Sequence, residues 1–236
     1  MNIALILAGG TGQRMGQDIP KQFLCIDNKP VFIYTLEHFQ KCAAIDAICV
    51  ACVPGWESVV YAYAGQFNIT KLRTVVTGGE NRFLSIFNLL NSINSFANES
   101  DIIMTYDAVR PVITDEIIQD SIAKTKEYGA AVGVIPCFDS MFSTEQPHAS
   151  LIGSQQPREL LYRGMGPDAT YLGTARKLFE KYLPINAKLA LSEMFLDSGL
   201  PIAKSISSSR CIKLTTLEDV ELFQAMLKYE KFKWLK

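Results

Sequence analysis

The stretch that decides the fold lies at the start of the chain. Residues 2–7 read Asn-Ile-Ala-Leu-Ile-Leu, and residues 8–16 read Ala-Gly-Gly-Thr-Gly-Gln-Arg-Met-Gly. The first part is a short apolar run of the kind that forms a strand buried on both faces. The second part is rich in glycine, which lets backbone N–H groups approach an anion closely. Together they predict an α/β sheet with an anion-binding loop at the carboxyl end of its first strand.

Apolar strand-like runs alternate with helical segments along the rest of the chain. Strands are predicted at 47–53, 72–76, 102–105, 130–136 and within 205–214, and helices at 31–42, 83–95, from Thr114 onward and at 217–227. This alternation predicts an α/β fold of three layers with a mostly parallel sheet. Residues 137–157 have little helical pattern and are expected to leave the sheet as an extended arm or hairpin. No linker or repeat interrupts the chain, so residues 1–236 are expected to form a single domain.

The composition narrows the function classes. The 236 residues are 48% apolar and 20% charged, with a net charge of −1. General nucleic-acid and membrane-surface binders usually carry a basic excess, so neither partner is expected. No apolar run reaches membrane-spanning length, and the N-terminus lacks the basic start and cleavage site of a signal peptide. A cytoplasmic location is therefore expected.

The six cysteines include one C-x-x-C pair, Cys49 and Cys52. Such a pair can hold a metal or exchange disulfides. Here it lies within a continuous apolar run that is predicted to be a buried strand, and residues three apart on a strand point to opposite faces. Core packing is therefore expected for both thiols, and no zinc site is expected.

Residues 7–16 are followed by Pro-Lys-Gln-Phe at 20–23. The glycine pattern matches neither the Walker loop nor the G-x-G-x-x-G fingerprint. The combination of L-A-G-G-x-G-x-R-M with P-K-Q-F resembles the cytidylyltransferases that act on methylerythritol phosphate and ribitol phosphate. The resemblance recurs at residues 78–85, 107–111 and 212–216 and spans nearly the whole chain. It implies a Rossmann-like nucleotidyltransferase fold with a protruding β-arm, and a reaction of CTP with a polyol phosphate that releases pyrophosphate.

The resemblance also implies roles for the nucleotide half of the site. Arg14 and Lys21 would be catalytic, because they stabilise charge that grows on the α- and β-phosphates of CTP. Asp107 would hold Mg²⁺ or another divalent cation, and Arg110 would contact the nucleotide or serve as a structural partner of Asp107. The remaining nucleotide-binding residues are Leu7, Ala8, Gly9, Gly10, Thr11, Gly12, Gly79, Glu80, Asn81, Arg82 and Ser85. Of these, Ser85 would read the cytosine edge, and Asn81 also suits a helix N-cap.

The resemblance also implies roles for the acceptor half of the site, with residues from the arm, from directly after it and from the late predicted strand. Ser140, Arg158 and Lys213 would bind the polyol phosphate. In the family the arm crosses a two-fold dimer, so Ser140 and Arg158 would serve the partner's site. Residues 137–157 are therefore expected to be a dimerisation arm of a homodimer.

Several acceptor-side features of the family are missing. Residues 165–170 read Met-Gly-Pro-Asp-Ala-Thr where the family usually has Thr-Pro-Gln followed by an aromatic residue, and Cys211 replaces the usual asparagine. The usual Thr-Asp-Asp is also absent near residues 190–193. The nucleotide half is intact, so the sequence indicates CTP more firmly than any named acceptor. Ribitol phosphate is slightly favoured, and the pathway stays open between an isoprenoid precursor and a cell-wall or capsule polymer.

Two other functions remain open from the sequence. A nucleotidyltransferase that acts on a sugar 1-phosphate with UTP or GTP would share the glycine-rich loop, the arginine and the Pro-Lys pair. A non-catalytic relative that only binds nucleotide is the second alternative, because of the lost acceptor motifs. The residues Arg14, Lys21 and Asp107 argue against the second.

Overall fold

The computed structural model describes residues 1–10, 19–185 and 189–232. Within these ranges a seven-stranded sheet forms the centre of the molecule, in the order β11-β7-β10-β6-β1-β4-β5. Its strands are β1 (Asn2–Ala8), β4 (Ala47–Cys52), β5 (Leu72–Thr77), β6 (Ile102–Asp107), β7 (Ala130–Pro136), β10 (Tyr162–Tyr171) and β11 (Ala203–Ile206). All neighbouring pairs are parallel except those of β10, which runs antiparallel to β6 and β7. The prediction of a mostly parallel sheet is confirmed.

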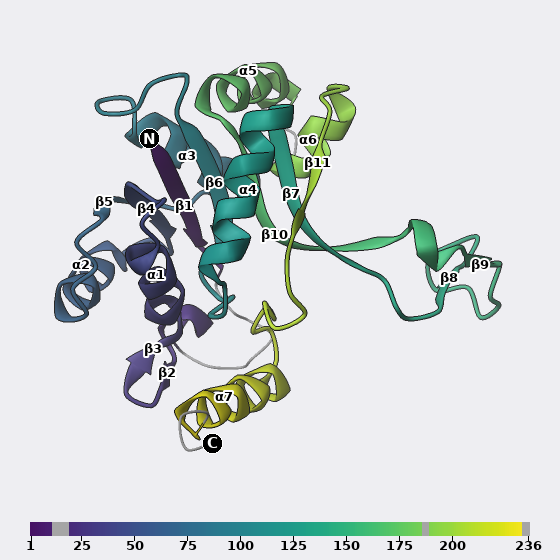
Figure 1. Cartoon of the computed structure of the whole chain (residues 1–236), viewed down its shortest axis with the longest axis horizontal. Helices are drawn as coiled ribbons and strands as arrows, with labels where there is room; N and C mark the ends of the chain where they lie inside the picture. The colour runs from purple at the N-terminus through teal and green to yellow at the C-terminus, as the bar shows by residue number, and fades with distance from the viewer. Residues whose placement is uncertain (11–18, 186–188, 233–236) are drawn as a thin grey trace.

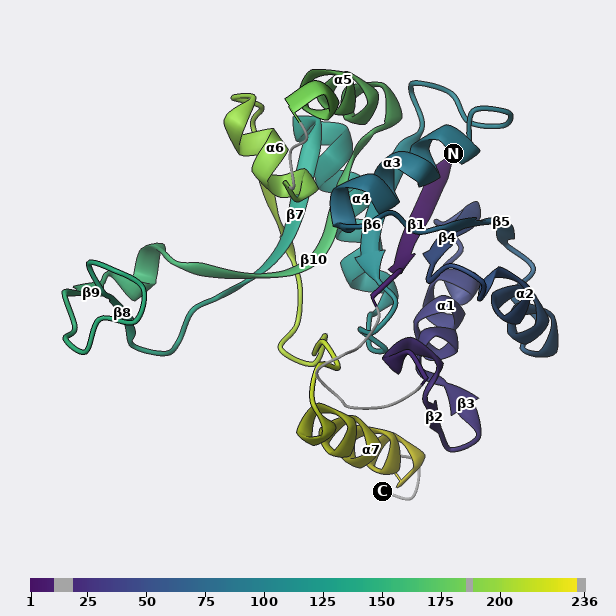
Figure 2. The same ribbon diagram turned by 180° about the vertical axis from the view of Figure 1, so that it is seen from behind.

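Helices cover both faces of this sheet (Figures 1 and 2). One apolar cluster joins a sheet face to α1 (Val31–Lys41), α2 (Glu57–Gln66) and α4 (Asp115–Tyr128). The other joins the opposite face to α3 (Arg82–Ser92), α5 (Leu172–Tyr182) and α6 (Leu191–Asp197). A third, smaller cluster holds α7 (Leu217–Phe232) beside the hairpin β2 (Cys25–Ile26) and β3 (Lys29–Pro30). None of the described helices is long and apolar enough to cross a bilayer.

The cysteine pair on β4 behaves as the sequence predicts. Every residue of this strand is buried. Cys52 belongs to the core cluster under α1, and Cys49 to the cluster under α3. The two thiols therefore lie on opposite faces of the sheet and cannot share a ligand.

Polar caps set the starts of two predicted helices. The Thr114 side chain accepts a hydrogen bond from the N–H of Ile117 and caps α4 (3.4 Å), with Asp115 and Glu116 in the first turn. The Asn81 side chain accepts from the N–H of Leu84 and caps α3 (2.9 Å). Each cap satisfies an N–H group that has no partner inside its helix.

In the later part of the chain the structure differs from the elements that the sequence predicts. The late strand predicted within 205–214 is β11, Ala203–Ile206, and the residues from 207 to 215 have no regular structure. Strand β10 and helices α2, α5 and α6 were not predicted. Glycine and proline within β10 argue against a central strand, yet its residues 168–170 are buried between β6 and β7 and have a partner on each side.

Strand β10 contains a bulge. Its register against β7 shifts between Gly164 and Asp168, so three residues of β10 lie opposite Gly133 alone. A Cβ atom at Gly133 would lie 2.2 Å from the carbonyl oxygen of Gly166, far closer than atoms can pack. Glycine at position 133 is therefore what admits the bulge, and bulges re-aim the side chains that follow them.

The predicted arm leaves the sheet between β7 and β10. It carries a short hairpin of β8 (Met141–Ser143) and β9 (Ser154–Gln156), followed by a 3₁₀ turn at Arg158–Leu160. Figures 1 and 2 show this hairpin projecting away from the body of the molecule. The protruding arm expected from the sequence is thus present.

We expect Gly133→Ala to lower the free energy of unfolding by about 1–3 kcal/mol, the usual cost of forcing an extra carbon into a packed site. Urea denaturation measures this change. Gly65→Ala in α2 is the control, because a Cβ atom there meets nothing within 4 Å and alanine favours a helix. A Gly133→Ala protein as stable as the wild type would contradict the account of the bulge.

Candidate functional site

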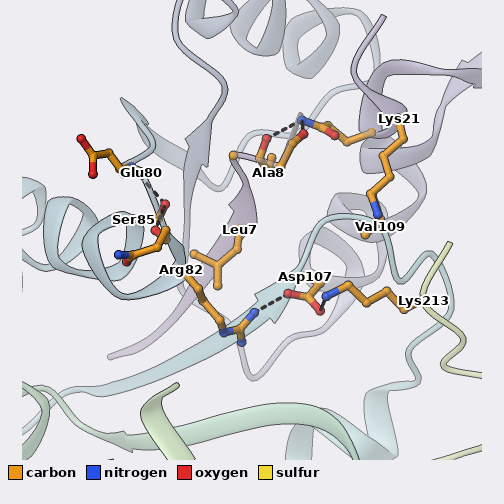
Figure 3. Close-up of a pocket in the computed structure, with 14 residues that line it drawn as sticks. Leu7, Ala8, Lys21, Glu80, Arg82, Ser85, Asp107, Val109 and Lys213 are labelled. Atoms are coloured by element: carbon orange, nitrogen blue, oxygen red, sulfur yellow. Dashed lines mark hydrogen bonds and ion pairs between the residues drawn. The ribbon is translucent and has the colours of Figure 1, made fainter. Parts of the chain in front are cut away.

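A cavity of about 260 Å³ lies where β1 and β6 end, side by side, at the carboxyl edge of the sheet (Figure 3). Ligands bind at this edge in open α/β sheets. Its walls come from the glycine-rich loop, the 3₁₀ turn at Lys21–Phe23, the start of α3 and the segment before α7. The lining residues are Leu7, Ala8, Gly9, Gly10, Lys21, Gln22, Gly79, Glu80, Asn81, Arg82, Ser85, Asp107, Val109 and Lys213.

Gln22 fixes the first part of the glycine-rich loop, and sequence reasoning missed this role. Its amide nitrogen donates hydrogen bonds to the carbonyl oxygens of Ala8 and Gly10 (2.5 and 3.0 Å), and its side chain is 1% exposed. These bonds join the loop to the 3₁₀ turn that carries Lys21. The available signal in the sequence was the glutamine of Pro-Lys-Gln-Phe, directly after Lys21.

The loop before α3 is compact because of Gly79 and Ser85. A Cβ atom at Gly79 would lie 2.3 Å from the Cβ of Leu84, so only glycine fits. The Ser85 hydroxyl accepts a hydrogen bond from the N–H of Gly79 (3.0 Å) and donates one to the carbonyl of Asn81 (2.8 Å). Its single proton is therefore used inside the loop. Ser85 lines the cavity, but in this state it organises the loop and has no proton to offer a base.

Asp107, at the end of β6, is the electrostatic centre of the site. Of the described cations, Arg82, Arg110 and Lys213 form ion pairs with its carboxylate, the last two at 3.3 and 3.0 Å. Burial alone would raise the pKa of Asp107, but the charges of Arg82 and Lys213 outweigh it and hold that pKa well below its ordinary value. Figure 3 shows Arg82 and Lys213 pointing toward Asp107, while Lys21 extends toward Val109 across the cavity.

Arg110 is a structural partner of Asp107, which is one of the two roles that the sequence left open for it. Besides Asp107 it contacts the late segment, donating a hydrogen bond to the carbonyl oxygen of Cys211 (2.7 Å). The N–H of Leu214 donates to the carbonyl of Val109 (2.9 Å). These two bonds flank Lys213 and hold its side chain over the site. The lysine is thus placed by an irregular segment and not by the strand that the sequence predicted.

A second cavity, of about 270 Å³, adjoins the first and shares Arg82, Asp107 and Lys213 with it. Its other walls come from β6, β7, the bulge of β10 and the start of α6. Asp168, directly after the bulge, lies in its wall and is 8% exposed. Burial raises the pKa of Asp168 to about 6, because the nearby Arg82 charge only partly offsets the loss of water and Asp107 adds repulsion.

The structure brings most of the predicted nucleotide-binding residues to the first cavity, and Lys213 with them. Arg110 lines the second cavity instead. Arg14, Thr11 and Gly12 lie outside the described residues, so their roles stay predictions. Ser140 and Arg158 lie on the arm, where they border an exposed hollow with Gln155 and Glu159. Within one chain they are not part of the site around Asp107.

Comparison with known proteins tests the resemblance. The family described as "IspD: 2-C-methyl-D-erythritol 4-phosphate cytidylyltransferase" matches residues 2–229. The chain belongs to this cytidylyltransferase family. The predicted enzyme class, cytidylyl transfer from CTP to a polyol phosphate, is thereby confirmed, in preference to a sugar 1-phosphate nucleotidyltransferase or a non-catalytic relative.

Relatives of known name match nearly the whole chain. The ribitol-5-phosphate cytidylyltransferase of Lacticaseibacillus paracasei is 33% identical over 97% of this chain and 98% of its own length. The enzyme of the same name from Vibrio parahaemolyticus is 34% identical over 96% of each chain. The crystal structure of 4-diphosphocytidyl-2C-methyl-D-erythritol synthase from Anaerococcus prevotii has a TM-score of 0.80 at 21% identity, covering 97% of this chain and 98% of its own. That structural likeness confirms the fold.

We expect Asp168→Asn to stabilise the protein at pH 8 by about 2–3 kcal/mol. The fold favours the protonated carboxyl, since the pKa rises from 3.8 to about 6, and each unit is worth about 1.4 kcal/mol. The destabilisation in the wild type is full above pH 6 and is lost as the pH falls through 6 toward 4. The advantage of the asparagine variant should therefore vanish near pH 4.

Urea denaturation of wild type and variant between pH 4 and pH 8 measures this difference. Glu180→Gln, at an exposed position on α5, is the control and should show no such trend. An asparagine variant less stable than the wild type at pH 8 would overturn the assignment of Asp168 as a destabilising buried charge.

Proposed function

We propose that this chain transfers the cytidylyl group of CTP to ribitol 5-phosphate and releases pyrophosphate. The observation that carries the proposal is the pair of adjoining cavities with Arg82, Asp107 and Lys213 in their common wall. CTP and the polyol phosphate react through their phosphate groups. Two adjoining cavities with cations in their common wall suit two such ligands. The names of the two relatives support ribitol 5-phosphate as the acceptor.

The chemistry is a displacement at the α-phosphorus of CTP. An oxygen of the acceptor phosphate forms a bond to this phosphorus, and the bond to the β-phosphate oxygen breaks, so that pyrophosphate leaves with its electron pair. Both reactants are polyanions, and their repulsion must be offset by fixed positive charge. Lys21 enters the first cavity from the glycine-loop side, while Arg82 and Lys213 enter from the side of Asp107. Arg14 is expected to add a further charge. These groups position the phosphates and stabilise the growing charge without forming a covalent intermediate.

The CTP base is proposed to lie against the compact loop from Gly79 to Ser85. The ordering of this loop by Ser85 leaves backbone groups as the readers of the cytosine edge.

Mg²⁺, or another divalent cation, is part of the proposal, with Asp107 as its protein ligand. Among the described residues no three His, Cys, Asp or Glu side chains gather to hold a metal ion. One carboxylate completed by phosphate oxygens and water suits Mg²⁺, and Asp107 faces the cavity that would hold the phosphates. The ion would neutralise phosphate charge when bound. Asp107 would share its carboxylate oxygens between the ion and its ion-pair partners Arg82 and Lys213.

A homodimer through the arm is also proposed, as is a cytoplasmic location. The arm exposes several large apolar side chains, among them Phe138 (78% exposed), Leu151 (82%) and Leu160 (73%). Contiguous exposed apolar surface marks interaction sites. A second copy on a two-fold axis would cover the arms reciprocally and bring Ser140 and Arg158 to the partner's acceptor cavity.

Pyrophosphate release with a panel of substrates tests the function. We expect CTP to exceed GTP and ATP at least 100-fold in kcat/KM. Ribitol 5-phosphate should exceed 2-C-methyl-D-erythritol 4-phosphate at least tenfold, since one misplaced group in a pocket is worth about that much. Faster turnover of 2-C-methyl-D-erythritol 4-phosphate would make that compound the acceptor in place of ribitol 5-phosphate, and the assignment of cytidylyl transfer would stand. No turnover with any polyol phosphate would refute the proposal.

Mixing two inactive variants tests the shared site. Lys21→Ala and Arg158→Ala are each expected to lower kcat by about 100-fold or more. When the two are unfolded and refolded together, half of the dimers should be mixed, and each mixed dimer has one intact site. About a quarter of wild-type activity should then return. No recovery in a sample shown to contain mixed dimers would mean that Lys21 and Arg158 serve the same chain's site.

A further inference from the structure

Asp168 occupies an unusual place in the sheet. It pairs with Thr105 of β6 on one side and Val132 of β7 on the other, so its side chain lies on the α3, α5 and α6 face. Its backbone is anchored by the Thr105 hydroxyl, which donates to the Asp168 carbonyl (3.4 Å). The bulge immediately before it opens the sheet at this point, and the carboxylate lines the second cavity.

Among the residues that the structure describes, none forms an ion pair with this buried carboxylate. The guanidinium groups of Arg82 and Arg110 line the same cavity and act on its charge, but both are paired with Asp107. Ser192, at the start of α6, lines the same cavity, and its hydroxyl favours the charged form of Asp168. A carboxylate can accept roughly four hydrogen bonds, so capacity remains on the side that faces the cavity.

A purely structural role explains this arrangement poorly. A buried carboxylate that no described cation pairs with destabilises the fold, and an amide or apolar side chain of similar size would stabilise it. Active sites are where such groups are retained at the expense of stability. The same stretch, residues 165–170, is where the sequence departs from the family pattern on the acceptor side. It borders the second cavity and not the first, against which CTP is proposed to bind.

We propose that Asp168 determines acceptor specificity: its carboxylate accepts hydrogen bonds from one or two adjacent hydroxyl groups on the carbon chain of the polyol phosphate. This inference rests on the proposed function. The acceptor's phosphate lies at the wall that the cavities share, between Arg82 and Lys213, and its carbon chain extends into the second cavity toward Asp168. Ser192, in the wall of the same cavity, is placed to orient the carboxylate toward these hydroxyls.

The selectivity follows from the chemistry of the group. An ionised carboxylate only accepts hydrogen bonds, so a hydroxyl satisfies it and a hydrogen atom or methyl group does not. A site built to bond a substrate hydroxyl rejects the analogue that lacks it strongly, because the buried polar group is then left without a partner. An acceptor with hydroxyls on consecutive carbons therefore fits this cavity.

The test is a cycle of one substitution and one substrate change. Wild type and Asp168→Asn are assayed by pyrophosphate release with ribitol 5-phosphate and with analogues that lack the hydroxyl at carbon 2, 3 or 4. We expect the substitution to raise the KM for ribitol 5-phosphate at least tenfold and to change the KM for CTP less than twofold. For the wild type, kcat/KM for at least one analogue should be 100-fold lower than for ribitol 5-phosphate. In the variant this analogue ratio should be at least tenfold smaller.

Two further variants separate this role from a structural one. Thr170→Val removes a buried hydroxyl on the same strand, which donates to the carbonyl of Gly129 (2.8 Å) outside the cavity, and it should leave every analogue ratio unchanged. Ser192→Ala should lower the same analogue ratio as Asp168→Asn, by about threefold to tenfold.

Equal losses for ribitol 5-phosphate and all its analogues in Asp168→Asn would overturn the inference while leaving the function standing. A parallel rise in the KM for CTP would do the same. If the wild type prefers another polyol phosphate, its deoxy analogues take the place of the ribitol series. If it turns over no polyol phosphate with CTP, the proposed function fails and the inference fails with it.

Discussion

The pairing of Asp107 with Arg82, Arg110 and Lys213 joins three separate parts of the chain. Asp107 ends β6, Arg82 begins α3, Arg110 follows in the next loop and Lys213 lies in the irregular segment before α7. A buried carboxylate must be paired to remain charged. Satisfying that one requirement brings the cations of both cavities to a common wall.

The same pairing offsets charge repulsion within the proposed site for two polyanions. Three clustered cations would repel one another, and Asp107 offsets part of that repulsion. When phosphates enter, they can take over some of the contacts that Asp107 makes in the free protein. Fixed charges held in position before the substrates arrive lose little free energy to reorganisation during the reaction.

The antiparallel strand β10 gives the molecule its second cavity. Its bulge, admitted by Gly133, interrupts the sheet beside Asp107 and leaves space between β6, β7 and α6. The chain that enters β10 comes directly from the arm. One departure from the parallel α/β pattern therefore supplies both the second cavity and the connection to the proposed dimer contact.

Local signals are enough to predict the parallel part of the fold. Apolar runs such as residues 2–7 mark buried strands, Asn81 and Thr114 mark helix starts, and the glycines at 9 and 10 mark a close backbone approach. Most residues of the first cavity follow from the resemblance to the cytidylyltransferases. The folded structure was needed to place β10, since its glycines and proline disfavour a central strand. It alone decided that Gln22 fixes the loop, that the proton of Ser85 is used internally and that Asp168 lines a cavity. Those roles depend on partners far along the chain, such as Ala8, Arg82 and Ser192, and no local pattern encodes a contact between segments that meet only after folding.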